Sequence, residues 1–342
     1  MRTGEMTLAM ASTADELTPA QAVLRDWLLC TDPPLHTAVR SALAPAFMPV
    51  RIEALRQDIR RITETLWTAW IEQPDADFVD RVAQPLPVQV IARVLGFPEE
   101  DVPLFREWNG VWRRAIDRDS EEGYAAAAPT AAAMVEYLRA HIERPPAGLA
   151  RPFDYPALVD RCGRDAVVAN LGLLIFAGSE TTGHLLSSMM LQLGLYPDAW
   201  GRLRRREVGA AAVVNETLRC ESPVQKIGFR LAAPFAYGEQ RLDVGDTVVV
   251  LVGAANRDPA AYTAPDRFDV GRHGTPELAF GAGPHACLGR RLAQLEAEIF
   301  LDVATNLFDE VIVEGWHWLP ETTFRALERL DLRIGRTGSP PA

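Results

Sequence analysis

Apolar residues recur at every third or fourth position along most of the 342-residue chain, a spacing typical of helices with one buried face. This pattern predicts helices over residues 51–70, 84–96, 123–143, 207–220 and 288–306. Between about Asp165 and Leu195 the chain is apolar on nearly every side. We therefore expect a long helix that crosses the interior there.

Strand-like sequence is confined to two parts of the chain. Residues 227–231 and 247–252 are rich in β-branched and apolar residues, with Gly238 and Gly245 at predicted turns. Short strands and turns are also predicted within residues 309–336. The expected fold class is therefore mainly α with a small β region.

The composition suits one globular domain over residues 1–342, with residues 1–26 as an N-terminal segment, because 48% of residues are hydrophobic and 24% charged. The net charge of −11 argues against nucleic acid as a partner. The apolar run 167–178 is too short to span a bilayer, so we expect no membrane association. The four cysteines show no paired spacing, which favours a reduced, cytoplasmic protein.

The most informative stretch is Phe280-Gly281-Ala282-Gly283-Pro284-His285-Ala286-Cys287-Leu288-Gly289. Its glycines and proline permit a tight backbone, and Cys287 precedes a predicted helix. A thiol at a helix N-terminus is expected to have a lowered pKa and to suit metal binding. An isolated cysteine is more often a buried structural residue, but the surrounding pattern favours a ligand.

A second unusual stretch, Ala177-Gly178-Ser179-Glu180-Thr181-Thr182, lies inside the long apolar helix. Burying a carboxylate and hydroxyls without partners costs free energy. A threonine hydroxyl can bond to an upstream carbonyl and open a small polar niche. From the residues alone, this stretch is either a satisfied polar kink or a place for oxygen and water.

The cysteine stretch closely resembles the haem-binding loop of the cytochrome P450 family, and the polar stretch resembles that family's oxygen-activation motif. The resemblance covers about residues 27–336 and implies the P450 fold, haem b as cofactor and dioxygen as co-substrate. Cys287 would be the metal ligand, with Phe280 beside its sulfur. Glu180 and Thr181 would be the catalytic acid–alcohol pair that delivers protons.

The resemblance also implies which residues surround the haem. His36 and Arg40, four apart on one predicted helix, would contact its propionates. The other expected cofactor-binding residues are Ala177 and Gly178, which would leave space beside the helix backbone, the propionate partners Arg230 and His285, and the loop residues Gly281 and Gly289.

Glu216-Thr217-Leu218-Arg219 places an acid and a base three residues apart, as in many surface ion pairs. Together with Pro265-Asp266-Arg267-Phe268 it resembles the family's structural Glu–Arg–Arg triad. The resemblance makes Arg267 the third member.

The implied activity is haem-thiolate monooxygenation, either hydroxylation or epoxidation, with electrons from a ferredoxin and a ferredoxin reductase. Arg290 and Arg291 could dock such an acidic partner or could simply be solvated. Two alternatives are a non-catalytic binding or recruitment module and a peroxide-driven haem enzyme. The ligand cysteine weighs against the first, and the acid–alcohol pair weighs against both.

The Asp32-Pro33-Pro34 motif lies closer to the first residue than in most family members. We expect most of the N-terminal helix, sheet and lid segment to be missing, and the pocket to be open. An open pocket suggests a bulky substrate, such as a peptide or a carrier-bound intermediate of antibiotic biosynthesis, including thiopeptide-type peptides. Phe105, Trp108 and Trp112 could line the open face, although aromatic residues at this spacing more often lie in a core.

Overall fold

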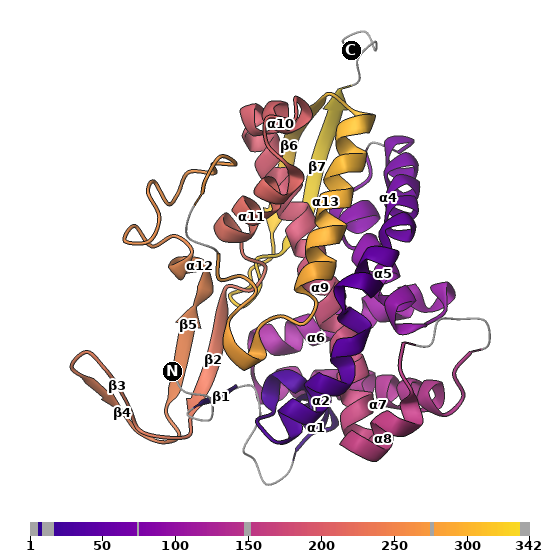
Figure 1. Cartoon of the computed structure of the whole chain (residues 1–342), viewed down its shortest axis with the longest axis vertical. Coiled ribbons are helices and arrows are strands. Elements are labelled where there is room, and N and C mark those ends of the chain that lie inside the picture. Colours follow the sequence, from indigo (N-terminus) through magenta and orange to yellow (C-terminus); the bar gives the residue numbers. More distant parts are fainter. Residues whose placement is uncertain (1–5, 9–16, 74, 147–151, 274–276, 336–342) are drawn as a thin grey trace.

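Helices make up most of the fold (Figure 1). The computed structural model describes residues 6–8, 17–73, 75–146, 152–273 and 277–335. The helices are α1 (Pro19–Arg25), α2 (Leu35–Leu43), α3 (Pro49–Ala54), α4 (Arg56–Ile71), α5 (Pro85–Leu95), α6 (Val102–Arg118), α7 (Glu121–Glu143), α8 (Tyr155–Cys162), α9 (Arg164–Leu195), α10 (Pro197–Arg204), α11 (Ala210–Cys220), α12 (Val252–Ala255) and α13 (Arg290–Leu307). Short helical turns are η1 (Leu28–Cys30), η2 (Ala44–Phe47), η3 (Val79–Ala83), η4 (Glu99–Asp101) and η5 (Gly283–His285).

Within the described residues the strands form three small antiparallel sheets. They are β1 (Met6–Leu8), β2 (Lys226–Leu231), β3 (Phe235–Tyr237), β4 (Gln240–Leu242), β5 (Thr247–Leu251), β6 (Glu310–Trp318) and β7 (Leu327–Gly335). The sheet order β1-β2-β5 pairs Phe229 with Val248, and the other two sheets are the hairpins β3-β4 and β6-β7. Gly238 and Gly245 both have positive φ, so both predicted turns are confirmed.

The long helix α9 is the centre of the fold, as its apolar sequence predicts. It runs unbroken for 32 residues and contacts α5, α6, α7, α8, α10, α11, α13 and the β6-β7 hairpin. In Figure 1 the sheet of β2 and β5 lies to one side of the helices, while β6 and β7 lie beside α13. By length and composition α9 could cross a membrane, but 83% of its most apolar window is buried inside the protein.

The other predicted helices and strands are present with small shifts of their ends. The largest difference is in residues 51–70, where two helices, α3 and α4, meet at Leu55. There the Leu55 N–H donates to carbonyls only two and three residues back, so the helical hydrogen-bond pattern is interrupted. The expected class, mainly α with a small β region, is confirmed.

Helix α6 fills a region in which the sequence pattern gave little guidance. Its residues Phe105, Trp108 and Trp112 are all buried, so they belong to the core and do not line an open face. Trp112 packs against Trp27, whose ring in turn stacks on Phe176 of α9. The expectation about the N-terminal segment falls mostly on residues 1–5 and 9–16, which lie outside the described part of the chain.

Candidate active site

The middle of α9 presents two chemically different faces. From Ala166 to Leu193 every residue is buried except Ala177, Gly178 and Thr181, which are partly exposed. At a spacing of one and four residues these three share one side of the helix. A long buried helix is therefore uncovered on one side only, where the oxygen-activation motif lies.

The Thr181 hydroxyl donates to the Ala177 carbonyl at 2.9 Å, which confirms the expected bond to an upstream carbonyl. At Gly178 the structure gives a different reason for the glycine. An added Cβ would lie 2.8 Å from Cδ1 of Ile91 on α5, so Gly178 allows two helices to approach closely. The space beside the α9 backbone is therefore bounded by Ile91 at this residue.

The cysteine loop folds back on itself before α13. The Cys287 N–H donates to the Phe280 carbonyl at 2.8 Å. Gly281 and Gly283 have φ angles of 65° and 72°, in the left-handed region that favours glycine. A Cβ added at either residue would meet nothing within 4 Å, so this side of the loop is open.

The structure brings three of the expected propionate partners together. The His36 and His285 rings lie 4.2 Å apart between centroids, and Arg40 donates to the Ala286 carbonyl at 2.7 Å. Burial lowers the pKa of both histidines, with Arg40 acting in the same direction. Arg230 lies on β2, and none of its described contacts joins it to this group, so its role stays a prediction.

The sequence expectation for the Cys287 thiol needs correction. Its side chain reaches the surface, but the dense protein around it raises its pKa above the ordinary value. Four smaller effects lower the thiol pKa but do not outweigh burial. They come from the N–H groups of Gly289 and Arg290 and from the charges of Arg40 and Arg290. Residue 290, not 288, begins helix α13, so the helix N-terminus lies farther from the sulfur than expected.

These residues fit a haem ligated by Cys287. His36 Nε2 and His285 Nδ1 are buried, and neither has a hydrogen-bond partner among the residues that the structure describes. Buried polar atoms of this kind require partners, which carboxylates of a propionate type would provide. The open side of the cysteine loop and the uncovered side of α9 supply the remaining space.

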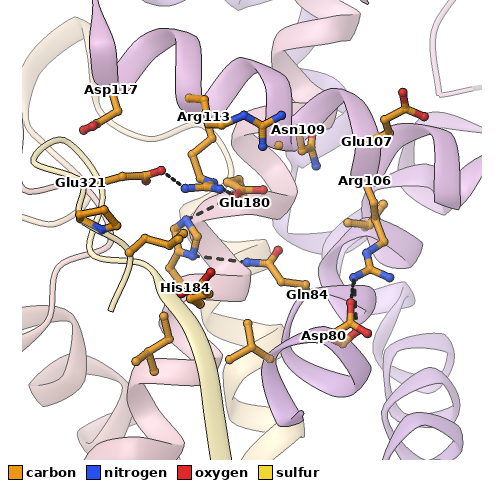
Figure 2. Close-up of a pocket in the computed structure, with 18 of the residues that line it drawn as sticks. Asp80, Gln84, Arg106, Glu107, Asn109, Arg113, Asp117, Glu180, His184 and Glu321 are labelled. Carbon is orange, nitrogen blue, oxygen red and sulfur yellow. Dashed lines mark hydrogen bonds and ion pairs between the residues drawn. The ribbon is translucent and has the colours of Figure 1, made fainter. Parts of the chain in front are cut away.

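Glu180 lies about 100° around α9 from Thr181 and faces a pocket of about 780 Å³ (Figure 2). Its Oε1 atom contacts Nε of Arg113 on α6 at 2.9 Å, and Arg113 also pairs with Glu321 in the loop after β6. The pocket lining runs from fully buried side chains such as His184 to exposed ones such as Glu107. The pocket therefore connects the Glu180 carboxyl with solvent.

The environment of Glu180 tunes its proton affinity. Burial raises the pKa of Glu180 to about 7, and Glu321 acts in the same direction, whereas Arg113 and Arg106 lower it. A carboxyl group with a pKa near 7 can both take up and release a proton at neutral pH. This is the property that a proton-delivering residue needs.

The structure corrects one member of the Glu–Arg–Arg triad. Arg219 binds both oxygens of Glu216 at 2.9 Å, as expected. The third guanidinium belongs to Arg272, whose Nε lies 3.2 and 3.3 Å from the same carboxylate. Arg267 contributes its backbone carbonyl, which accepts from Arg219 at 3.0 Å, so its assignment to the triad was wrong.

Asn256 joins this region to the cysteine loop. Its side-chain oxygen accepts from the N–H of Leu278, and its amide nitrogen donates to Ser222 after α11. Its backbone carbonyl accepts from Arg219 at 2.9 Å. The buried ion pairs are thus connected to the segment that leads into Phe280.

Both arginines that follow the cysteine loop have partners. Arg290 lies over the Phe280 ring at 4.8 Å and contacts Glu277 at 3.2 Å. Arg291 lies within 4 Å of Glu53 and of Glu298. A docking partner would have to compete with these contacts.

The sequence interpretation missed Arg113, Glu321, His184 and Gln84. His184 could have been found, because it lies four residues after Glu180 and therefore on the same helix face. Arg113 could have been placed by the apolar spacing of α6, because it lies four residues after the buried Asn109 and therefore at the edge of the buried face. Glu321 lies in a loop whose path no local pattern indicates.

The comparisons with known proteins agree on one family. A family model described as Cytochrome P450 matches residues 210–309. Cytochrome P450 107B1 of Saccharopolyspora erythraea is 35% identical, with 90% of this chain and 77% of that relative covered. Cytochrome P450 monooxygenase PikC of Streptomyces venezuelae is 33% identical, with 94% and 79% covered. The crystal structure of P450BioI in complex with an acyl carrier protein ligated to hexadec-9Z-enoic acid has a TM-score of 0.87 at 28% identity, with 93% of this chain and 84% of that chain covered.

The chain belongs to the cytochrome P450 family and is a monooxygenase-type oxidoreductase. Members of this family use haem b iron and dioxygen. The expected family, enzyme class and cofactors are thereby confirmed.

Proposed function

We propose that Cys287 ligates the haem iron and that Glu180 and Thr181 deliver protons during monooxygenation of a bulky natural-product intermediate. Bound haem b supplies the iron centre at which dioxygen is activated. The observation that supports this assignment most strongly is the uncovered side of α9, limited to Ala177, Gly178 and Thr181. His36, Arg40, Arg230 and His285 would hold the propionates.

The proton path follows from the two faces of α9. Solvent enters the pocket of Figure 2, and Glu180 at its inner end takes up a proton. Glu180 then releases that proton around the helix toward Thr181, its neighbour in sequence. Because the Thr181 hydroxyl bonds to the Ala177 carbonyl, its oxygen lone pairs remain able to accept.

A carrier-bound acyl intermediate is the substrate class that we favour over a peptide. The similar P450BioI was crystallised with a fatty acid ligated to an acyl carrier protein. The enzyme would recognise a tethered substrate in two places. An apolar space would hold the acyl chain, and the protein surface would bind the carrier. The reaction would be hydroxylation, with epoxidation where the chain carries a double bond.

A spectroscopic titration of the haem-loaded enzyme separates the substrate classes. We expect spin-state shifts with acyl chains on a carrier protein at lower concentration than with the free acids, and no shift with thiopeptide-type peptides. Shifts with peptides alone would replace the carrier-bound class by peptides. Tighter shifts with small apolar compounds than with either would contradict a bulky substrate altogether.

Electrons would come from a ferredoxin and its reductase in the cytoplasm. This part is tested by reconstituting turnover with a ferredoxin pair and, separately, with peroxide. Turnover with the ferredoxin pair at low salt that falls at high salt is the expected result. Turnover with peroxide alone would contradict it.

A further inference from the structure

His184 is the side chain beside Glu180 that the proposed proton path leaves without a role. It is 1% exposed and lies one turn beyond Glu180 on the same face of α9 (Figure 2). Its Nε2 lies 3.5 Å from Oε1 of Glu180, and its Nδ1 lies 3.4 Å from Nε2 of Gln84. The ring therefore stands between an amide and the proposed proton-delivering carboxyl group.

The packing around Gln84 holds this arrangement in place. Gln84 follows the helical turn η3, and its amide lies directly over Gly183 of α9. A Cβ at residue 183 would come within 2.6 Å of Oε1 of Gln84. Only a glycine there allows the Gln84 amide to reach the His184 ring undisturbed.

The amide decides which ring nitrogen carries the hydrogen. Burial lowers the pKa of His184 to about 3, so at pH 7 its ring is neutral and has one donor and one acceptor. The amide nitrogen of Gln84 can only donate, so Nδ1 accepts and Nε2 carries the hydrogen. Nε2 is buried and makes no hydrogen bond within the described ranges, and Oε1 of Glu180, 3.5 Å away, is the carboxyl oxygen that can serve as its acceptor.

Two N–H groups lie nearest to the same carboxyl oxygen, Oε1 of Glu180. Nε of Arg113 contacts Oε1 at 2.9 Å, and Nε2 of His184 lies 3.5 Å from the same atom. In both pairs Oε1 is the nearer of the two carboxyl oxygens. A proton on Oε1 would lie against both N–H groups, whereas a proton on Oε2 would lie on the oxygen farther from them.

We infer that His184, oriented by Gln84, is a positioning residue that fixes Oε1 of Glu180 together with Arg113, so that Oε2 is the oxygen that takes up and releases the proton. In the resting state Oε2 accepts a proton from pocket water, and in delivery it gives the same proton toward Thr181. The carboxylate is restored and His184 keeps its hydrogen throughout. This inference rests on the proposed role of Glu180.

The test measures the protonation of Glu180 directly in the haem-loaded enzyme. The carboxylic C=O stretching band that disappears in Glu180→Gln is titrated by difference infrared spectroscopy in the wild type, His184→Gln and His184→Met. Glutamine keeps an N–H donor at this position, whereas methionine fills similar volume without one. The groups that face Glu180 from neighbouring elements, Arg113, Arg106 and Glu321, are unchanged in all of these proteins.

We expect a midpoint near 7 in the wild type and in His184→Gln. In His184→Met the midpoint should rise by roughly one pH unit, because the carboxylate loses a donor. Gln84→Leu, which removes the amide beside Nδ1 of His184, should raise the midpoint by a smaller amount. Glu107→Gln, on an exposed part of the pocket lining, is the control and should leave the midpoint unchanged.

Equal midpoints in the wild type and His184→Met would overturn the inference, as would equal shifts in the methionine and glutamine variants. Thermal melting and haem content identify a variant that fails to fold, in which case Gln84→Leu decides the question by itself. The proposed function fails separately, if the reduced wild-type enzyme with carbon monoxide lacks a thiolate-type Soret band.

Discussion

The two faces of α9 meet at adjacent residues but are built for different tasks. On the side of Thr181 the helix is partly uncovered, and the paired histidines His36 and His285 each have an unsatisfied polar atom. On the side of Glu180 the helix faces the pocket of Figure 2, where Glu180, Arg113 and Glu321 form ion pairs. The first side has the features expected of a site that receives a group, whereas the charges of the second adjust a proton affinity.

This difference would allow one helix to serve both oxygen and proton chemistry, as we propose. An ionisable group on the uncovered face would be desolvated by whatever binds there. Because Glu180 points into a different space from Thr181, the fold keeps its pKa under the control of Arg113, Glu321 and Arg106. Substrate binding can then change without changing the proton supply.

The largest effect is expected from Cys287, the proposed ligand of the haem iron. Cys287→Ser should abolish the thiolate-type Soret band of the reduced carbon monoxide complex and reduce product formation below detection, because a hydroxyl cannot replace the thiolate. Cys162→Ser on α8 is the matched control and should retain both. An unchanged spectrum in Cys287→Ser would show that another residue ligates the iron.

The next largest effect is expected on the free energy of unfolding, from the buried ion pairs of Glu216. Arg272→Ala should destabilise the protein by about 3–5 kcal/mol, because it leaves part of the buried charge of Glu216 without its partner. Arg267→Ala should cost far less, since Arg267 contributes only its backbone carbonyl. Chemical denaturation of both variants checks this, and a larger loss in Arg267→Ala would restore the sequence-based assignment.

On the side of Glu180, Arg113→Met should change the pH dependence of turnover more than it changes the stability of the haem site. Removing the guanidinium raises the pKa of Glu180 above about 7, so Glu180 stays protonated to higher pH. The limb of the turnover profile that depends on Glu180 deprotonation should therefore move to higher pH. Arg114→Met, next in sequence and without an ion pair in the described part of the chain, should leave the profile in place.

The smallest effect is expected where the uncovered face meets α5. Gly178→Ala forces a methyl group against Ile91 and should cost about 1–3 kcal/mol in thermal or chemical unfolding. Ile91→Val removes the closest atom, Cδ1, and in combination with Gly178→Ala should recover part of that loss. Strict additivity of the two substitutions would contradict a direct contact.

Much of the uncovered face could be predicted from the sequence, because its information is local. The cysteine loop, the polar stretch of α9 and the Glu216–Arg219 pair are each contained in ten or fewer consecutive residues. The third triad arginine was misplaced because residues 256–289 follow an irregular path with no period to indicate which side chain turns inward. Arg272 is only five residues from Arg267, yet the two residues take part through different groups. The guanidinium of Arg272 contacts Glu216, whereas the backbone carbonyl of Arg267 accepts from Arg219.

The side of Glu180 could not be predicted to the same extent. Arg113, Gln84 and Glu321 come from α6, the end of η3 and the loop after β6, and they meet only because these elements pack around α9. Their contacts depend on the tertiary fold and leave no short pattern in the sequence. The expected lowering of the Cys287 pKa was also wrong. The sequence indicates a nearby helix N-terminus, which lowers a thiol pKa, but it does not show the dense protein around the thiol, which raises it.

A crystal structure of the haem-loaded enzyme tests the separation of the two faces most directly. We predict iron ligated by Sγ of Cys287, propionates beside His36 and His285, and the macrocycle against Ala177, Gly178 and Thr181, while Glu180 keeps its contact with Arg113. A haem ligated elsewhere, or a Glu180 carboxyl group that turns from Arg113 to face the macrocycle, would contradict the account.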